Sequence, residues 1–407
     1  MIRVLVRVAV ALAALVIVVG VGIAAYTLVP WQQSDDAGAA APEIAVRPSL
    51  AAWPPAGATG VPLDTDIRID VRGQKLTKLS VSGPDGLEVP GYRSPDGEWW
   101  LTRASLAPAT EYQVTAKLAA DGRKARTKRW TFTTMTPSGT LGVRVTPGDN
   151  EVVGVGQPIW LRFTAPVADK AAVEERLVVN TSVPVEGSWR WINDREAHWR
   201  PAEYWPPGTE VWFDGNLHGV NAGNGIIGNV HRTAHFRIGD SHISIADTVN
   251  HTLTVMENGV VIKRFPMSAG KPEFPTMSGT HIVLGKAESV VMDSRTNGIP
   301  LESSEGYLQT VYWDTQISTT GEYVHSAPWS VSSQGRANVS HGCINLSPAN
   351  AEWFFHWSQR GDIVQVNGTP KPPNNDLAVI DWKIPYEEWV TGSALFEVPI
   401  KQRVRVR

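Results

Sequence analysis

The chain has 407 residues, with 37 Lys and Arg against 40 Asp and Glu, and a formal net charge of −3. Because both signs of charge are mixed along the chain, the composition gives no electrostatic reason to expect a nucleic-acid partner. The 29 prolines and 36 glycines are spread through the chain, and no long amphipathic helical pattern follows the N-terminal segment. The sequence therefore predicts a mainly β protein of two or three domains.

The first predicted element is an uncharged run of 22 residues at 8–29, preceded by Arg3 and Arg7. At 1.5 Å per residue this run is long enough to cross a hydrocarbon core of ~30 Å. We expect residues 1–41 to hold a single-pass membrane anchor and linker, with the N-terminus cytoplasmic and the remainder in the periplasm or wall space. The alternative is a signal peptide cleaved near residues 37–41, which would give a secreted protein.

Residues 42–136 show short alternating strands between turn signals, a pattern typical of an immunoglobulin-like β-sandwich. The pattern then recurs. The segments 106–114 and 130–132 are echoed by 204–213 and 235–238. We therefore expect two related sandwiches, at 42–136 and 137–239.

Tryptophans and histidines are concentrated in the second predicted sandwich. Aromatic clusters bind glycans in some proteins, whereas alternating tryptophans on strands usually fill a core, and we favour the core. The histidines lack the carboxylate or cysteine spacing of a metal site, so we expect a polar loop there. The residues concerned are Trp189, Trp191, Trp199, Trp205 and Trp212, with His218, His231 and His235.

Residues 240–369 form the third predicted domain. Asn258-Gly259 predicts a tight turn between two strands, and Thr320-Gly321 joins another pair. One main helix should follow, with Ser347 as N-cap, Pro348 in its first turn and Gly361 at its end. We expect the aromatic tail at 370–407 to dock on a neighbouring domain.

Cys343 is the only cysteine in the chain. In an oxidising compartment, a cysteine without an intramolecular partner is either a buried apolar filler or a reactive thiol. Its polar neighbours Ser340 and His341 favour the thiol. An adjacent imidazole generates a thiolate near neutral pH, so Cys343 and one histidine predict a nucleophile and its base. Spacing alone leaves open whether that histidine is His341 or His325.

A family resemblance emerges from these residues. His325, fourteen residues, then Ser340-His341-Gly342-Cys343-Ile344-Asn345 resembles the signature of the L,D-transpeptidase catalytic domain, the YkuD fold. The wider chain is similar to the mycobacterial and actinobacterial form with two N-terminal immunoglobulin-like domains. Further matching pieces are Met292-Asp293-Ser294, Gly306-Tyr307, His325-Ser326-Ala327-Pro328-Trp329-Ser330 and Asn345-Leu346-Ser347-Pro348.

The resemblance implies a fold and a catalytic pair. Two immunoglobulin-like β-sandwiches precede a YkuD-type β-rich catalytic domain with one main helix after the catalytic cysteine, and the tail at 370–407 packs on that domain. Cys343 is the nucleophile and His325 its base or thiolate partner. The backbone carbonyl of Ser326 orients the His325 ring, and His341 has a structural or assisting role.

The resemblance also implies how substrate and charge are held. Backbone N–H groups of Gly342 and Cys343, with the Tyr307 hydroxyl nearby, would meet the developing oxyanion. No cofactor and no metal are expected. The implied substrate-binding residues are Met292, Tyr307, Ser326, Trp329 and Asn345.

The implied reaction takes place on peptidoglycan. The thiolate would attack a tetrapeptide stem between its diamino acid and the terminal D-alanine. The acyl group would then pass to the diamino acid side-chain amine of an acceptor stem, giving a 3-3 cross-link in cell wall biogenesis. Carbapenem β-lactams would acylate the same thiol.

Several alternatives stay open at this point. An L,D-carboxypeptidase, a lipoprotein-anchoring transferase or a non-catalytic wall-binding scaffold would use the same fold. A papain-like protease is disfavoured because its local signature is absent and His325 precedes Cys343. A zinc site is disfavoured because no fourth ligand is placed.

Overall fold

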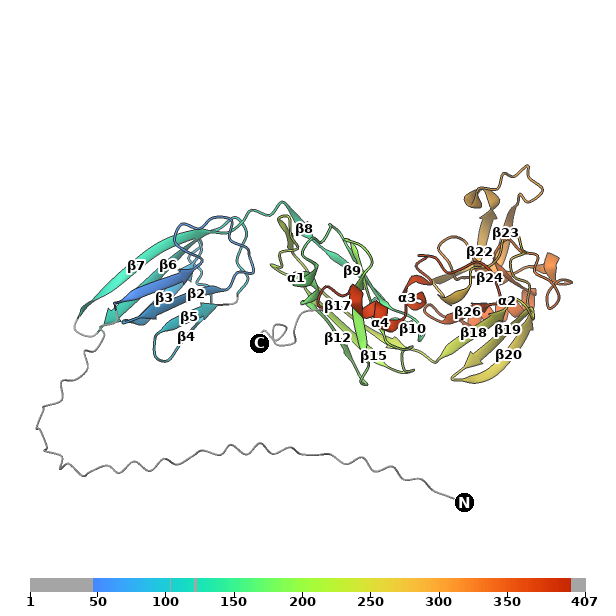
Figure 1. Ribbon diagram of the computed structural model, residues 1–407, viewed down its shortest axis with the longest axis horizontal. Coiled ribbons are helices and arrows are strands. Elements are labelled where there is room, and N and C mark those ends of the chain that lie inside the picture. Colours follow the sequence, from blue (N-terminus) through green and yellow to red (C-terminus); the bar gives the residue numbers. More distant parts are fainter. Residues whose placement is uncertain (1–46, 103, 121–122, 397–407) are drawn as a thin grey trace, which may run out of the picture. The chain divides into compact units, whose positions relative to one another are not determined.

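The computed structural model describes residues 47–102, 104–120 and 123–396 (Figure 1). The predicted membrane anchor within 1–41 lies outside these residues, as does the basic end of the chain at 397–407. No helix in the described ranges has both the length and the apolar character needed to cross a bilayer.

The first sandwich contains a four-stranded sheet, in the order β1-β2-β5-β4, and a three-stranded sheet, β3-β6-β7. In β2 every second residue is buried, because successive side chains of a strand point to opposite faces. Both sheets contribute to one apolar core. The strands are β1 (Ser49–Trp53), β2 (Ile67–Arg72), β3 (Lys75–Ser82), β4 (Tyr92–Arg93), β5 (Trp99–Thr102), β6 (Glu111–Ala120) and β7 (Arg123–Thr133).

The second sandwich contains the sheets β13-β14-β11-β9 and β10-β17-β15-β12, with a short parallel pair of β8 and β16. Its elements are β8 (Gly139–Leu141), β9 (Val143–Thr146), β10 (Val152–Val153), β11 (Ile159–Phe163), α1 (Lys170–Glu174), β12 (Leu177–Thr181), β13 (Gly187–Trp191), β14 (Glu196–Pro201), β15 (Glu210–Asn216), β16 (Ile226–Gly228) and β17 (His231–Ile238). Trp189, Trp199 and Trp205 are buried in its core, which confirms the core interpretation for these three. Trp212 is different, since it is 42% exposed.

The third domain contains a five-stranded sheet, β20-β19-β18-β26-β21, and a four-stranded sheet, β22-β23-β24-β25. The Asn258-Gly259 turn joins β19 and β20 as predicted, with positive φ at both residues. Its elements are β18 (His242–Asp247), β19 (Thr252–Glu257), β20 (Val260–Pro266), β21 (Gly279–Ile282), β22 (Gly285–Asp293), η1 (Ser294–Asn297), β23 (Leu308–Gln316), β24 (Tyr323–Ser326), η2 (Pro328–Ser330), β25 (Ile344–Leu346) and β26 (Ile363–Asn367).

The predicted helix is α2 (Pro348–Trp357). Ser347 occupies the N-cap position, but its hydroxyl makes no capping hydrogen bond. The helix ends before Gly361 because the backbone is already extended at Ser358, where ψ is 153°. The buried face of α2 shares a core with β24 and β25. The helix thus supports the strands that precede it in the sequence.

The tail bridges two domains. Its first part contacts the third domain: Asp376 accepts from the Ser318 hydroxyl, and Ala378 accepts from a backbone N–H of β21. Asp381 instead contacts the second sandwich, accepting from His198 Nδ1 at 2.6 Å and from Trp160 Nε1 at 2.8 Å. The prediction that the whole tail packs on the third domain is therefore wrong for its described second half.

One cation explains where the second half of the tail binds. The elements of this part of the tail are α3 (Ile380–Lys383), α4 (Tyr386–Trp389) and η3 (Val390–Gly392). Arg200 on β14 is 2% exposed, and its guanidinium carbon lies 4.8 Å from the ring centroids of both Trp382 and Trp389. Its Nη2 also donates to the Ile384 carbonyl at 2.7 Å. Because aromatic faces attract a desolvated guanidinium, the aromatic second half of the tail binds to the second sandwich at Arg200.

Candidate active site

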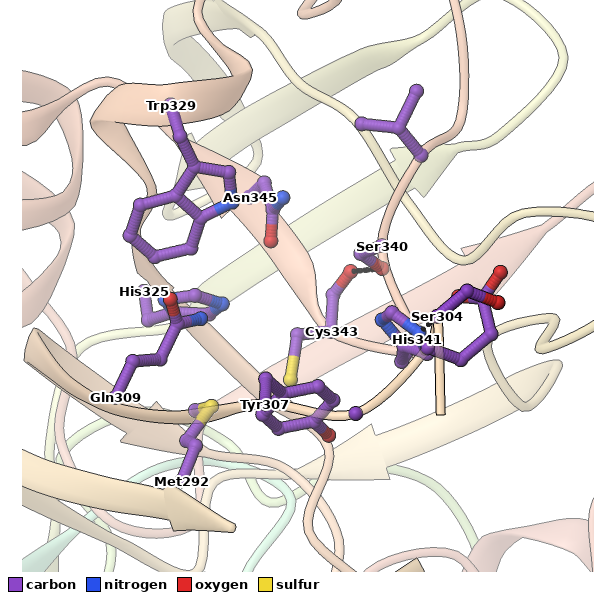
Figure 2. A pocket seen from close by; sticks show the side chains of 13 residues that line it. Met292, Ser304, Tyr307, Gln309, His325, Trp329, Ser340, His341, Cys343 and Asn345 are labelled. Atoms are coloured by element: carbon purple, nitrogen blue, oxygen red, sulfur yellow. Dashed lines mark hydrogen bonds and ion pairs between the residues drawn. The ribbon is translucent and has the colours of Figure 1, made fainter. Parts of the chain in front are cut away.

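The parallel pairing of β24 with β25 brings the two motif segments together. Val324 pairs with Ile344 and His325 with Asn345. Cys343 comes immediately before β25, so a three-residue strand separates it from the helix α2 that follows. Figure 2 shows His325 and Cys343 pointing into one pocket. The register of this strand pair therefore brings His325 into the pocket of the thiol, which His341 also lines.

The pocket has a volume of about 280 Å³. Seven of the nine predicted site residues line it, whereas Ser326 and Gly342 do not. Ser304, Glu305, Gln309 and Val339 also line it and were not predicted as site residues. The complete lining is Met292, Ser304, Glu305, Gly306, Tyr307, Gln309, His325, Trp329, Val339, Ser340, His341, Cys343 and Asn345.

The connection between β22 and β23 supplies one wall of the pocket. Met292 is near the end of β22 and Gln309 near the start of β23. Tyr307 is fixed at its backbone, where its N–H donates to the Ser294 hydroxyl at 3.0 Å and its carbonyl accepts from the Ser294 N–H at 2.9 Å. Glu305 and Gln309 gave no sequence signal of their own, because Glu305 lies in a connection that carries no period and Gln309 is a single polar residue near the start of β23.

His325 is held as a neutral, oriented imidazole. The ring is 2% exposed, and its Nδ1 donates to the Ser326 carbonyl at 3.0 Å. Because a carbonyl only accepts, this contact assigns the proton to Nδ1 and leaves Nε2 as the acceptor. Burial lowers the pKa of His325 from 6.5 to about 4, although Ser326 and Asn345 oppose that shift.

Cys343 is a neutral thiol in this arrangement. Burial raises its pKa from 9.0 to about 12, and the carboxylates of Glu322 and Asp314 add to the shift. Its Sγ has the Gly321 carbonyl as a weak acceptor at 3.6 Å. The pKa directions of the Cys343 thiol and of the His325 imidazole therefore both favour the neutral forms.

Ser340 holds the loop that presents the thiol. Its hydroxyl donates to the Cys343 carbonyl at 2.6 Å and accepts from the Gly342 N–H at 3.1 Å. Thr276 Oγ1 donates to the Gly342 carbonyl at 2.8 Å. The Gly342 N–H therefore already has a partner inside the loop, and its role as an oxyanion donor stays a prediction. The glycine is required for another reason, because its φ is +127°.

His341 forms part of a polar cluster at the pocket edge. Its Nε2 donates to the Glu305 carboxylate at 2.8 Å, and the same carboxylate oxygen accepts from Lys271. Its ring lies 4.9 Å from the ring of Phe274 and 5.0 Å from that of Tyr307. His341 therefore connects the cysteine loop to the wall that carries Glu305, and its Nε2 does not face the thiol.

The remaining predicted residues surround the imidazole. Trp329 is 53% exposed, and its ring centroid is 6.1 Å from that of His325. Asn345 Nδ2 donates to the Ser330 hydroxyl at 3.2 Å. Trp329 thus offers an apolar surface at the pocket mouth, while the Ser330 hydroxyl fixes the orientation of the Asn345 side-chain amide.

A β-bulge opposite His325 was not predicted. The register of β23 against β24 shifts between Tyr312 and Thr315, and Trp313 has a φ of 59°. Asp314, inside the bulge, is fully buried. Bulges commonly re-aim side chains beside active sites. Within the described ranges, no cluster of three or more His, Cys, Asp or Glu residues is arranged to hold a metal.

A thiol beside an imidazole that is oriented by a carbonyl, set in an open pocket, defines a cysteine-dependent enzyme. Comparison with known proteins agrees. Residues 58–221 match a bacterial Ig domain, and residues 241–366 match the L,D-transpeptidase catalytic domain, YkuD. These matches confirm the predicted fold class of immunoglobulin-like sandwiches followed by a YkuD catalytic domain.

Named relatives are consistent with these matches. L,D-transpeptidase 2 of Mycobacterium tuberculosis is 42% identical over 85% of each chain. L,D-transpeptidase 5 of the same species is 32% identical over 87% of this chain and 78% of its own. The structure of LD transpeptidase LdtMt1 in complex with imipenem is 44% identical over 56% of this chain and 99% of its own, with a TM-score of 0.49. The chain belongs to the L,D-transpeptidase family.

Proposed function

We propose that the chain forms 3-3 cross-links in peptidoglycan outside the cytoplasmic membrane. Cys343 would attack the carbonyl between the diamino acid and the terminal D-alanine of a tetrapeptide stem. The acyl group would then pass to the diamino acid side-chain amine of another stem. The observation that carries the proposal is the hydrogen bond from His325 Nδ1 to the Ser326 carbonyl at 3.0 Å, which makes Nε2 the proton acceptor in the pocket that also contains Cys343, the only cysteine of the chain.

The tautomer of His325 determines the path of the proton. As Sγ bonds to the stem carbonyl, the thiol proton moves to His325 Nε2 and the carbonyl becomes an oxyanion. Collapse of the intermediate breaks the C–N bond, and the imidazolium returns its proton to the departing D-alanine amine. The second half reverses these steps: His325 accepts a proton from the acceptor amine as nitrogen replaces sulfur on the carbonyl.

The oxyanion is assigned to two of the three donors that the resemblance implies. With the Gly342 N–H occupied by Ser340, we assign the developing charge to the Cys343 N–H and the Tyr307 hydroxyl. Tyr307 lines the pocket, and the negative charge of a Cys343 thiolate is one of the influences, after burial, that raise its pKa. A hydroxyl that stays protonated remains a donor throughout the reaction.

The donor stem is assigned to the lined pocket. Met292 and Trp329 provide apolar surface, and Gln309 and Asn345 provide amide groups for a peptide backbone. Because the relative LdtMt1 was solved in complex with imipenem, we also propose that carbapenems acylate Cys343 here. The carbonyl of the strained β-lactam ring would take the place of the stem carbonyl as the group that the thiol attacks.

The test is intact mass of the chain after incubation with a disaccharide-tetrapeptide, with released products followed in parallel. We expect an acyl adduct, free D-alanine and a cross-linked dimer for the wild-type chain. Cys343→Ala should give none of them. His325→Gln should form the adduct far more slowly, by roughly 10²-fold or more for loss of a general base. An adduct with tripeptide and no dimer would replace the proposal with a carboxypeptidase.

A further inference from the structure

The β3-β6-β7 sheet of the first sandwich carries an unusual concentration of positive charge. Its three strands contain eight Lys or Arg residues and one acidic residue, Glu111. The chain as a whole has a net charge of −3, so this sheet departs from the average sign of the protein. The strands lie side by side in Figure 1.

The strand register places part of this charge on one outward face. On β6, Tyr112, Val114, Ala116 and Leu118 are buried, so the alternate residues point away from the core. Lys117 is one of them, and it pairs with Lys78 on β3 and with Thr127 on β7. One row further along, Thr115 pairs with Arg129. Lys78, Lys117 and Arg129 therefore form a cationic face, which we define by these three residues.

Nothing in the described part of the chain neutralises this face. The side chains of Lys78, Lys117 and Arg129 make no ion pair and no hydrogen bond with another described residue, and all three residues are exposed. Like charges directly opposite each other on neighbouring strands destabilise a sheet. A pairing of Lys78 with Lys117 is thus unfavourable for folding alone, and such local conflicts are typical of functional sites.

Edge protection explains only part of the charge. Edge strands commonly carry lysines that prevent pairing with other chains, and β7 is an edge strand that is exposed at every described residue from Lys124 to Arg129. Lys117, however, is on the central strand β6. A cation in the middle of the sheet protects no edge, so the face needs another explanation.

The neighbouring side chains indicate the kind of partner. Between the cations, the outward positions carry hydroxyl and amide groups, from Ser80, Gln113, Thr115, Thr127 and Thr131. The apolar side chains that flank them on this face, Ala119 and Ala125, are too short to enter a bilayer, and membrane-surface sites require larger ones. Aromatic side chains that would stack on bases are also absent from these positions. A hydrated polymer with carboxylates fits such a face.

We propose that this cationic face binds peptidoglycan through the free carboxylates of its stem peptides, apart from the catalytic pocket. This inference rests on the proposed function, which makes peptidoglycan the material on which the enzyme acts. Many weak contacts with a repeating polyanion would keep the enzyme on its insoluble substrate between turnovers. The bound carboxylates would belong to strands other than the one being acylated.

The test is co-sedimentation of the full-length chain with purified sacculi, in a Cys343→Ala background that prevents covalent capture. The test variant is Lys78→Gln/Lys117→Gln/Arg129→Gln. The matched control removes three exposed arginines elsewhere, as Arg144→Gln/Arg232→Gln/Arg264→Gln. We expect the test variant to bind about tenfold more weakly, and the difference to shrink with added salt. The control should bind like the parent chain.

Two further arms identify the ligand. Sacculi with amidated carboxyl groups should bind the parent chain as weakly as the test variant does. Vesicles of phosphatidylglycerol should show no difference between the test and control variants. Equal binding of the two variants to untreated sacculi would overturn the proposal, as would a deficit of the test variant on vesicles alone or unchanged binding after amidation.

A separate measurement distinguishes this inference from the proposed function. With Cys343 intact, the triple variant at Lys78, Lys117 and Arg129 should still acylate on a soluble disaccharide-tetrapeptide at the parent rate. Failure of the parent chain to acylate would refute the proposed reaction and leave sacculus binding as measured. Normal acylation together with unaltered sacculus binding of the triple variant would refute only the cationic face. Unchanged circular dichroism and a monomeric state exclude misfolding or aggregation as the cause of any loss.

Discussion

Replacing Asp314 by Asn tests whether the buried carboxylate in the bulge opposite His325 lowers both the stability of the fold and the reactivity of the Cys343 thiol. Asp314 is 0% exposed, and neither carboxylate oxygen has a hydrogen-bond partner in the described ranges. Burial raises its pKa from 3.8 to about 7, and the nearby N–H of Val290 offsets only part of that shift. In addition to burial, the Asp314 charge contributes to the raised pKa of Cys343.

The sign of the effect follows from the pKa. A carboxyl whose pKa is higher in the folded chain binds its proton more tightly there, so ionisation at rising pH destabilises the fold. The destabilisation begins above pH 3.8, grows toward about 7 and is complete beyond it. The difference between these two pKa values corresponds to a loss of at most ~4 kcal/mol in the free energy of unfolding. We expect a loss of ~2 to 4 kcal/mol after solvent screening. Asp314→Asn should therefore stabilise the catalytic domain at high pH.

The assay compares wild type and Asp314→Asn by calorimetric unfolding, and by alkylation of Cys343, at acidic and alkaline pH. We expect nearly equal stability near pH 4, a gain for the variant near pH 8.5, and faster alkylation there because the thiol loses a negative neighbour. The exposed carboxyl of Asp194 provides the control, since Asp194→Asn should change neither. A pH-independent gain, or slower alkylation, would refute the reasoning.

Three other changes test the tail and the cysteine loop. Asp381 and Glu196 raise the pKa of His198 to about 9 against the effect of burial, so their stabilisation is complete below pH 6.5 and is lost as pH rises through about 9. Hydrogen exchange at residues 380–396 should show this loss, and a persistent pH dependence in Asp381→Asn would contradict the assignment. Gly342→Ala, at φ +127°, should slow acylation by roughly a hundredfold; wild-type kinetics would show that the loop tolerates strain. Ser340→Ala should cost ~1 to 3 kcal/mol and slow acylation, with partial recovery in Ser340→Thr, and equal thermal midpoints would argue against its bracing role.

The strands and their turns were largely predictable from sequence. Alternation in β2, the Asn258-Gly259 turn and the proline at the start of α2 are local signals, decided by residues within a few positions of each other. The lone thiol of Cys343 was also recognisable, because it depends only on counting cysteines and reading the neighbouring residues. The resemblance extended these signals to a family that the comparisons confirm.

The tertiary structure decided what depends on register and burial. That His325 lies in the same pocket as Cys343 follows from the parallel pairing of β24 and β25, whose partners are separated by twenty residues and share no local signal. The partner of the Gly342 N–H depends on the rotamer of Ser340.

The same limit applies to Asp314 and to the tail. Nothing in the sequence around Asp314 distinguishes a buried carboxyl from a solvated one, because burial depends on strands that pair across the sheet. The tail was recognisable as aromatic, but its partner Arg200 is nearly 200 residues away in the chain, with Nη2 on the Ile384 carbonyl. By itself the sequence determined most of the elements, the single cysteine and its polar neighbours, and the family. Only the folded chain determined which groups meet, because long-range pairing and desolvation are properties of the packed structure.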